Sequence, residues 1–287
     1  MPGFERILSM GITGSGKSYT WLTIARELKN SGVKFRCVDT DNDINFMLEN
    51  QFEDLLPENK GNVYVVPAFD WPEYKRAIKW IKQKDLSKDD LEWFREYDKH
   101  IIDAYNTPIK PNDWVVTDKA NNAWSRVQSY FVESVFGEDF GDYFLKIRKE
   151  LREKDDIGKS GKKMTSVSLE AIDGWKDWPV INKLYEDFML PLIYRVHCNI
   201  YAATDVDKLD NKEKDPQILN MFGKLKIKPA GQKAIGGQFH SIFLLIPDET
   251  KWLIKTVKDR SGRAYFDKTP LFSFYKQYLV AKAGWTL

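Results

Sequence analysis

The chain has 287 residues, of which 43% are hydrophobic and 14% aromatic, a composition that excludes a disordered protein and can supply a large core. Its 44 Lys and Arg residues nearly balance its 42 Asp and Glu residues, which excludes a protein that coats DNA through overall positive charge; any nucleic-acid surface must be local. Two cysteines without metal-ligand spacing, Cys37 and Cys198, and three isolated histidines argue against disulfides and a zinc site.

Membrane segments are not indicated by the sequence. No apolar run approaches the roughly 20 residues that span a bilayer, and the first residues lack the apolar stretch of a signal peptide. We therefore expect a soluble, cytoplasmic protein with no membrane partner.

Apolar runs alternate with helical patterns along the chain, which favours a mostly parallel sheet flanked by helices. Strands are expected over residues 5–10, 33–39, 62–66, 113–118 and 199–204, with a C-terminal β-hairpin formed by residues 240–246 and 251–257. Helices are expected over residues 17–30, 72–83 and 121–135. Three more are expected to begin at Ser87, at Pro179 and after a Thr269-Pro270 cap. A charged helix is expected from residue 146, which runs into a loop by residue 164. We predict one α/β domain over residues 1–287, with helical or charged insertions near 84–110 and 137–175.

A phosphate loop is the most specific motif in the chain. Its pattern, G-x-x-x-x-G-K-[ST], lies between the first expected strand and the first expected helix, as phosphate binding requires. Glycines let successive backbone N–H groups converge at a helix N-terminus, which favours an anion, and the lysine adds a mobile charge. The residues predicted to bind ATP are Gly11, Thr13, Gly14, Ser15, Gly16, Lys17, Ser18 and Tyr19.

Carboxylates at the ends of neighbouring strands supply the remaining chemistry. Asp118 ends an apolar strand and is predicted to hold Mg²⁺ together with the Ser18 hydroxyl. The next residue, Lys119, is not the glutamate that many phosphate-loop motors carry there. Asp39 and Asp41 follow the second strand, where either carboxylate can orient the attacking water, while Asp41 and its neighbours can equally cap the next helix.

The chain resembles the RecA-like ATPases, and in particular the compact ATPases that phages and archaeal viruses use in recombination and single-strand annealing. The resemblance rests on five segments in the expected order: the phosphate loop, Cys37-Val38-Asp39-Thr40-Asp41, Trp114-Val115-Val116-Thr117-Asp118, Ile200-Tyr201-Ala202-Ala203-Thr204-Asp205 and Lys258-Asp259-Arg260.

The resemblance implies a RecA-like P-loop core and a role for several further residues. Asp41 falls at the position of the catalytic carboxylate, which is usually a glutamate. Thr204 and Asp205 fall where the family senses the γ-phosphate. Lys258 and Arg260 fall where related ring-forming ATPases reach into a neighbouring subunit's nucleotide. The resemblance thus implies a homo-oligomer, either ring or filament, encoded by a phage or virus and acting in the host cytoplasm.

Two basic segments follow the strands after which RecA-like proteins contact DNA. Residues 146–163 hold eight Lys or Arg and four acidic residues, and residues 206–238 hold seven Lys and four acidic residues. Segments rich in lysine and glycine can follow a phosphate backbone without reading its sequence, although many such segments are only solvated loops. Phe222 is the one clear stacking residue within the second segment.

Three functions remain open on these observations. The first is a Mg²⁺-dependent, nucleic-acid-stimulated ATPase acting on DNA, mainly single-stranded, in recombination, annealing or replication. In this reading Lys17, Asp41, Asp118, Asp205, Lys258 and Arg260 carry the chemistry. The second is a viral DNA-packaging motor ATPase, and the third is a nucleoside or small-molecule kinase, although no arginine-rich lid is evident. The sequence does not decide between ATP and GTP.

Overall fold

The computed structural model describes residues 4–159, 176–262 and 265–285. Its strands are β1 (Arg6–Met10), β2 (Phe35–Asp39), β3 (Val63–Pro67), β4 (Trp114–Asp118), β5 (Asn199–Thr204), β6 (Val206–Lys208), β7 (Ile227–Pro229), β8 (Ser241–Asp248), β9 (Lys251–Asp259) and β10 (Thr269–Leu271). Its α-helices are α1 (Lys17–Glu27), α2 (Asp43–Gln51), α3 (Trp71–Lys82), α4 (Lys88–Tyr97), α5 (Lys99–Asn106), α6 (Ala120–Phe136), α7 (Phe140–Lys159), α8 (Asp177–Leu190), α9 (Pro216–Phe222) and α10 (Ile235–Gln238). Short 3₁₀ turns cover Lys29–Ser31, Glu53–Leu55 and Pro57–Asn59, and π-helical turns cover Pro191–Arg195 and Tyr275–Val280.

The main sheet has the strand order β10-β9-β8-β1-β5-β4-β2-β3 among the described residues. The six strands from β8 to β3 run parallel, and β9 and β10 add an antiparallel edge. The β2–β4 register pairs Asp39 with Asp118, and the β1–β5 register pairs Met10 with Thr204. The carboxyl ends of these strands therefore meet at one edge, where the phosphate loop follows β1.

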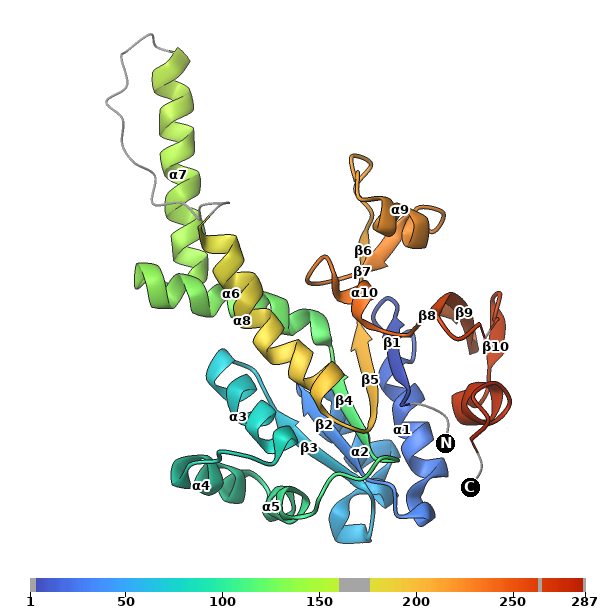
Figure 1. The fold of residues 1–287 in the computed structure, drawn as a ribbon. Coiled ribbons are helices and arrows are strands. Elements are labelled where there is room, and N and C mark those ends of the chain that lie inside the picture. The colour runs from blue at the N-terminus through green and yellow to red at the C-terminus, as the bar shows by residue number, and fades with distance from the viewer. Residues whose placement is uncertain (1–3, 160–175, 263–264, 286–287) are drawn as a thin grey trace.

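Helices cover both faces of this sheet, as the apolar strands require (Figure 1). Successive residues of one strand point to opposite faces: in β2, Cys37 packs into the core beneath α1 and α2, whereas Val38 packs into the core beneath α3, α6 and α8. The predicted α/β fold, a mostly parallel sheet with flanking helices and a C-terminal β-hairpin, is confirmed.

Several elements extend beyond the core. Helices α4 and α5 lie in the charged stretch between α3 and β4. Helix α4 begins after Ser87, as predicted, and Ser87 forms a capping box with Asp90. Helix α7 projects away from the sheet beyond α6 and α8 (Figure 1). The connection after β5 contains the small β6–β7 sheet, α9 and α10.

Four sequence expectations need correction. Thr269-Pro270 does not cap a helix but lies in β10, because Thr269 pairs with Ile254 of β9 and extends the sheet edge. Helix α1 ends at Glu27 rather than residue 30 because the chain tightens into a 3₁₀ turn that Gly32 closes with φ 75°. Helix α8 begins at Asp177, two residues before Pro179. The basic segment over residues 206–238 is not only a solvated loop, because it contains β6, α9, β7 and α10. Residues 160–164 of the predicted charged segment lie outside the described residues.

Candidate nucleotide-binding site

The phosphate loop, residues 11–18, has the backbone that the motif requires. Gly14 and Gly16 adopt φ 78° and 83°, which side-chain-bearing residues rarely adopt. Gly11 is needed for a different reason from the predicted one: a Cβ there would lie 2.3 Å from Ser15 Oγ and 2.6 Å from the carbonyl oxygen of Leu245. Because Gly16 caps α1 and has no side chain, the first N–H groups of the helix remain available to an anion.

Lys17 lies inside this loop rather than in solvent. Its Nζ donates to the carbonyl oxygens of Gly11 (2.8 Å) and Ile12 (3.0 Å) and to Asp205 Oδ1 (3.0 Å). The lysine side chain is only 6% exposed. Lys17 and Asp205, 188 residues apart in sequence, are therefore brought together at the loop.

Asp118 lies at the base of the loop and is fully buried. The indole Nε1 of Trp21 donates to Asp118 Oδ2 at 2.9 Å. Burial raises the pKa of Asp118, whereas hydrogen bonds from Trp21 and from the Ser18 side chain lower it. The hydroxyl of Ser18 and the carboxylate of Asp118 are thus neighbours, and their role in holding an ion stays a prediction.

The residues present fit Mg²⁺-nucleotide binding. Ser15 Oγ is fully buried and has no hydrogen-bond partner among the described residues, as expected of a group whose partner is a ligand. Mg²⁺ is usually held by one or two protein groups together with phosphate oxygens and water, and Ser18 with Asp118 matches that donor set. Within the described ranges, no group of three or more His, Cys, Asp or Glu side chains is arranged to hold a metal ion by itself.

Asp39 and Asp41 have different surroundings, which separates the two candidates for the catalytic carboxylate. Asp39 accepts hydrogen bonds from the backbone N–H groups of Asp41, Asn42 and Ile44, so it holds the turn that begins α2. Asp41 instead forms an ion pair with Lys119. Burial lowers the pKa of Lys119, but the hydrogen bond with Asp41 and the nearby carboxylates outweigh it and raise that pKa overall. Asp39 is thus held by backbone N–H groups, whereas Asp41 is held by Lys119, a residue that lines the cavity beside the loop.

A cavity of about 300 Å³ opens beside the loop. Its walls come from the loop, the start of α1, the end of β4, α2 and the hairpin strand β9: Thr13, Gly14, Ser15, Gly16, Lys17, Ser18, Tyr19, Asp43, Met47, Gln51, Asp118, Lys119 and Trp252. The predicted ATP ligand Tyr19 contributes a ring that packs against Trp252, with centroids 4.9 Å apart.

Sequence reasoning missed two contributors to this site. Trp252 donates from Nε1 to the carbonyl oxygen of Gly14 (3.2 Å), and a Cβ at Gly16 would lie 2.8 Å from its ring. Asn121 accepts through Oδ1 from Thr204 Oγ1 (3.3 Å) and from the backbone N–H of Asp205 (3.2 Å). No local motif marks either residue, because each joins the site only through the order of the strands.

Lys258 and Arg260 are not near the loop in this chain. Lys258 Nζ donates to the carbonyl oxygens of Gly236 (2.9 Å) and Phe239 (2.7 Å), and Arg260 Nη2 donates to that of Gly237 (3.1 Å). Burial, followed by the charge of Arg260, lowers the pKa of Lys258 to about 8. Their predicted role in a neighbouring subunit's site stays a prediction.

The pKa of Asp39 gives a test of this arrangement. Burial raises that pKa; the backbone hydrogen bond from Asp41 lowers it, and the charges of Asp118 and Asp41 raise it again, giving about 7 against an ordinary 3.8. The folded chain therefore holds more protons than the unfolded chain between about pH 4 and pH 7, so this group's contribution to stability is lost as pH rises through that window.

We expect Asp39→Asn, which cannot titrate, to lose less thermal stability than the wild type between about pH 5 and pH 8. Thermal denaturation followed by circular dichroism at several pH values measures the difference. Equal losses in the two proteins would show that Asp39 does not titrate in this window.

Comparisons with known proteins give fold neighbours only. No protein-family model matches the chain, and no curated protein matches its sequence. Similar solved structures include the RadB recombinase (13% identity, 92% of this chain and 86% of that chain, TM-score 0.44) and a KaiC-like protein from Pyrococcus horikoshii (13%, 93% and 87%, 0.44). Another is the flagellar accessory protein FlaH from Methanocaldococcus jannaschii (10%, 93% and 84%, 0.40). Similarity at this level does not assign a function.

Proposed function

We propose that this chain is a Mg²⁺-dependent ATPase that acts on DNA, mainly single-stranded, as a homo-oligomer in recombination or annealing. The observation that carries the proposal is the phosphate loop, in which Gly14 and Gly16 shape the backbone while Lys17 and a buried, unpartnered Ser15 hydroxyl line the interior. Residues 1–287 would form one ATPase domain, and its insertions would contact DNA or neighbouring subunits.

The side chains of the site divide the work of hydrolysis among them. Lys17 exchanges Asp205 for the β- and γ-phosphates of ATP, because a phosphate oxygen carries more negative charge than one carboxylate. Mg²⁺ held by Ser18 and Asp118 would supply charge neutralisation at the phosphates. Lys119 turns from Asp41 toward the γ-phosphate, which frees the Asp41 carboxylate to orient the attacking water. Asp205, released from Lys17, reports the presence of the γ-phosphate.

The proposed partners rest on charge and position. Exposed lysines line the β6–β7 insertion, and α7 carries the exposed Arg148, Lys149 and Arg152, so both segments can contact a phosphate backbone. Among the described residues, none of the helices combines the length and the apolar character that bilayer crossing demands. A DNA role of the recombination and annealing kind agrees with the resemblance of the five sequence segments to phage and archaeal-virus ATPases.

The rate of phosphate release from ATP, with and without single-stranded DNA, tests the proposal. We expect Mg²⁺-dependent hydrolysis that increases when DNA is added. Hydrolysis that is indifferent to DNA, together with phosphate transfer to a small acceptor, would instead identify a kinase.

Arg260→Ala tests the contribution of a neighbouring subunit. Because the Arg260 side chain is exposed and, among the described contacts, donates only to the carbonyl oxygen of Gly237 in α10, we expect the variant to fold and to bind ATP normally while its turnover falls about 10- to 100-fold. Turnover measured over a range of protein concentrations, with Lys282→Ala as an exposed-lysine control, checks this. Wild-type turnover per subunit that neither depends on concentration nor on Arg260 would refute the role.

A further inference from the structure

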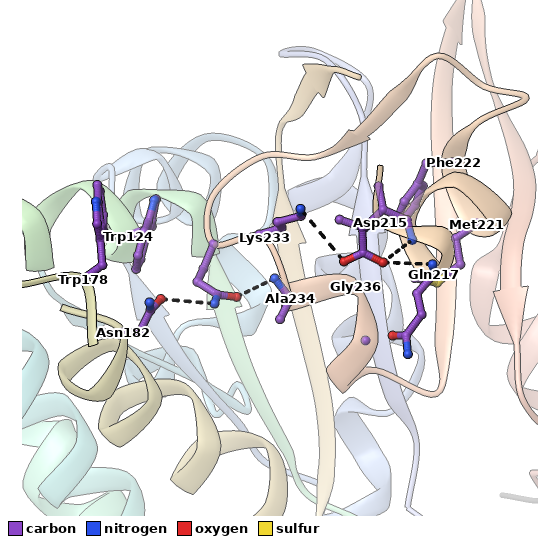
Figure 2. Close-up of a pocket in the computed structure, with 13 residues that line it drawn as sticks. Trp124, Trp178, Asn182, Asp215, Gln217, Met221, Phe222, Lys233, Ala234 and Gly236 are labelled. Atoms are coloured by element: carbon purple, nitrogen blue, oxygen red, sulfur yellow. Dashed lines mark hydrogen bonds and ion pairs between the residues drawn. The ribbon is translucent and has the colours of Figure 1, made fainter. Parts of the chain in front are cut away.

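A second cavity, of about 460 Å³, lies apart from the nucleotide site, between helices α6 and α8 and the insertion that follows β5 (Figure 2). Trp124 and Trp178 form one wall, and Phe222 and Met221 of α9 contribute to the other. The proposed hydrolysis uses none of these side chains. The cavity is therefore separate from the nucleotide site.

The two tryptophan rings stack on each other, and contacts hold them in place. The rings of Trp124 and Trp178 lie 6.0 Å apart at an interplanar angle of 21°. Trp124 is fixed from behind by an edge contact with Tyr185 (5.3 Å, 86°), and Trp178 is 36% exposed at the mouth. A planar aromatic ligand can stack on such a surface at little cost in side-chain entropy.

Amide groups border the aromatic wall. Gln232 Nε2 donates to Asn182 Oδ1 at 3.3 Å, and Gln232 Oε1 accepts from the backbone N–H of Ala234 (Figure 2). Gln217 also lines the cavity. Amides both donate and accept hydrogen bonds, so they complement the edge of a nucleobase as no purely apolar wall would.

The insertion that borders the cavity carries lysine side chains, which can attract a polyanion. Lys233, at the rim, is already paired with Glu213 (3.0 Å) and lies 3.9 Å from Asp215. The other exposed lysines of the insertion have no ion pair among the described contacts: Lys208, Lys212, Lys214, Lys224 and Lys226. The insertion therefore offers positive charge to a phosphate backbone beside an aromatic cavity.

Hydrogen bonds join this cavity to the nucleotide site. The backbone carbonyl of Asp205, the partner of Lys17, accepts from the N–H of Ala230 (2.8 Å), two residues before Gln232, which lines the cavity. Asn121, which holds Asp205, lies one turn before Trp124 in α6. A Cβ at Gly231 would lie 3.2 Å from the Cα of Asn121, so the two walls are in close contact at this point.

We propose that this cavity binds an unpaired base of single-stranded DNA, which stacks on Trp178 and Trp124 while the lysines of the insertion bind the flanking phosphates. This inference rests on the proposed function and names its DNA site. Because Asp205 is hydrogen-bonded to Ala230 and Asn121, which lie close in sequence to the cavity residues Gln232 and Trp124, the release of Asp205 by Lys17 in the ATP-bound state is coupled to the cavity.

Binding of a fluorescein-labelled oligothymidylate, followed by anisotropy at low and moderate salt, tests the proposal with the wild type, Trp178→Ala, Trp178→Phe and Trp93→Ala. Trp93 is the matched control, since it stacks on Tyr97 (5.9 Å, 7°) in a second tryptophan-containing pair on α4. We expect Trp178→Ala to weaken binding about tenfold or more, Trp178→Phe to recover most of it, and Trp93→Ala to bind as the wild type does. Addition of the oligonucleotide should also quench the tryptophan fluorescence of the wild type and of Trp93→Ala.

The outcomes separate this proposal from the one on which it rests. Wild-type affinity in Trp178→Ala, or equal losses in Trp178→Ala and Trp93→Ala, would overturn the cavity as the base site while leaving a DNA-dependent ATPase intact. A wild type that hydrolyses ATP but binds no oligonucleotide, and binds an apolar peptide in the cavity instead, would overturn it as well. Absence of hydrolysis in the wild type would instead refute the proposed function.

Discussion

Lys17→Ala is expected to lose ATP hydrolysis, with turnover at least about a hundredfold below that of the wild type. The Lys17 Nζ lies inside the phosphate loop, within 3.0 Å of two loop carbonyl oxygens and of Asp205 Oδ1. Lys17 therefore supplies the positive charge at the centre of the loop. A charged donor aimed at developing negative charge in a water-poor site contributes about 2.7–4 kcal/mol to the rate, which corresponds to 10²- to 10³-fold. Phosphate release under saturating Mg²⁺-ATP measures the effect.

Two controls make this result specific. Lys84→Ala removes an exposed lysine from the turn after α3 and should hydrolyse ATP at the wild-type rate. The melting temperature of Lys17→Ala should remain close to that of the wild type, because the ion pair lost with Asp205 is partly exposed on the aspartate side. Near-normal turnover in a folded Lys17→Ala protein would show that this loop is not the site of hydrolysis.

Asp113→Ala is expected to reduce the free energy of unfolding by about 3–5 kcal/mol. Asp113 Oδ2 lies 3.1 Å from Arg36 Nη1, and the two side chains are 2% and 0% exposed. The aspartate also accepts from the backbone N–H groups of Lys34 (2.9 Å) and Lys110 (3.0 Å). Its removal leaves a buried guanidinium without a counter-charge and two N–H groups without an acceptor, and water cannot readily replace either.

Urea denaturation compares this variant with an exposed ion pair of the same type. Asp54→Ala removes the partner of Arg26, where the two side chains are 41% and 42% exposed, and should cost less than about 1 kcal/mol. The slope of unfolding free energy against urea should stay constant, so that a shift in midpoint reports stability alone. Losses of equal size in the two variants would contradict the assignment of Arg36 and Asp113 as a buried structural pair.

The position of this pair also explains why it is assigned to stability and not to chemistry. Arg36 lies near the start of β2 and Asp113 just before β4, whereas Asp39 and Asp118 end the same strands. In a parallel sheet, ligands bind beyond the carboxyl ends of the strands, which places Arg36 and Asp113 at the opposite edge.

Elements with a strong local signal were predictable from the sequence. Strand β5 has its predicted bounds, and the hairpin strands β8 and β9 lie on either side of the expected turn, because continuous apolar runs and turn residues specify these elements locally. The helix predicted from Thr269-Pro270 was wrong because the prediction used only a local pattern. A threonine before a proline is a common helix start, yet these residues pair with the edge strand β9 and form β10. A competition between a cap and a sheet edge is decided by tertiary contacts, which a local pattern does not contain.

The nucleotide site was predictable to the extent that it is contiguous. The phosphate loop occupies eight successive residues, and Asp118 stands at a strand end, so both could be found by pattern. Trp252, Asn121 and the Lys119–Asp41 ion pair could not, because each depends on which strands lie side by side. The stacking surface of Trp124 and Trp178 joins helices separated by residues 137–176 and likewise has no local signature.

A crystal structure with Mg²⁺ and a non-hydrolysable ATP analogue tests the central claim most directly. We expect the β- and γ-phosphates on the backbone N–H groups of the phosphate loop, with Lys17 Nζ moved from Asp205 to the phosphates and Ser18 and Asp118 beside the metal ion. Density for the analogue at any other place in the molecule, with Lys17 still paired to Asp205, would contradict the account.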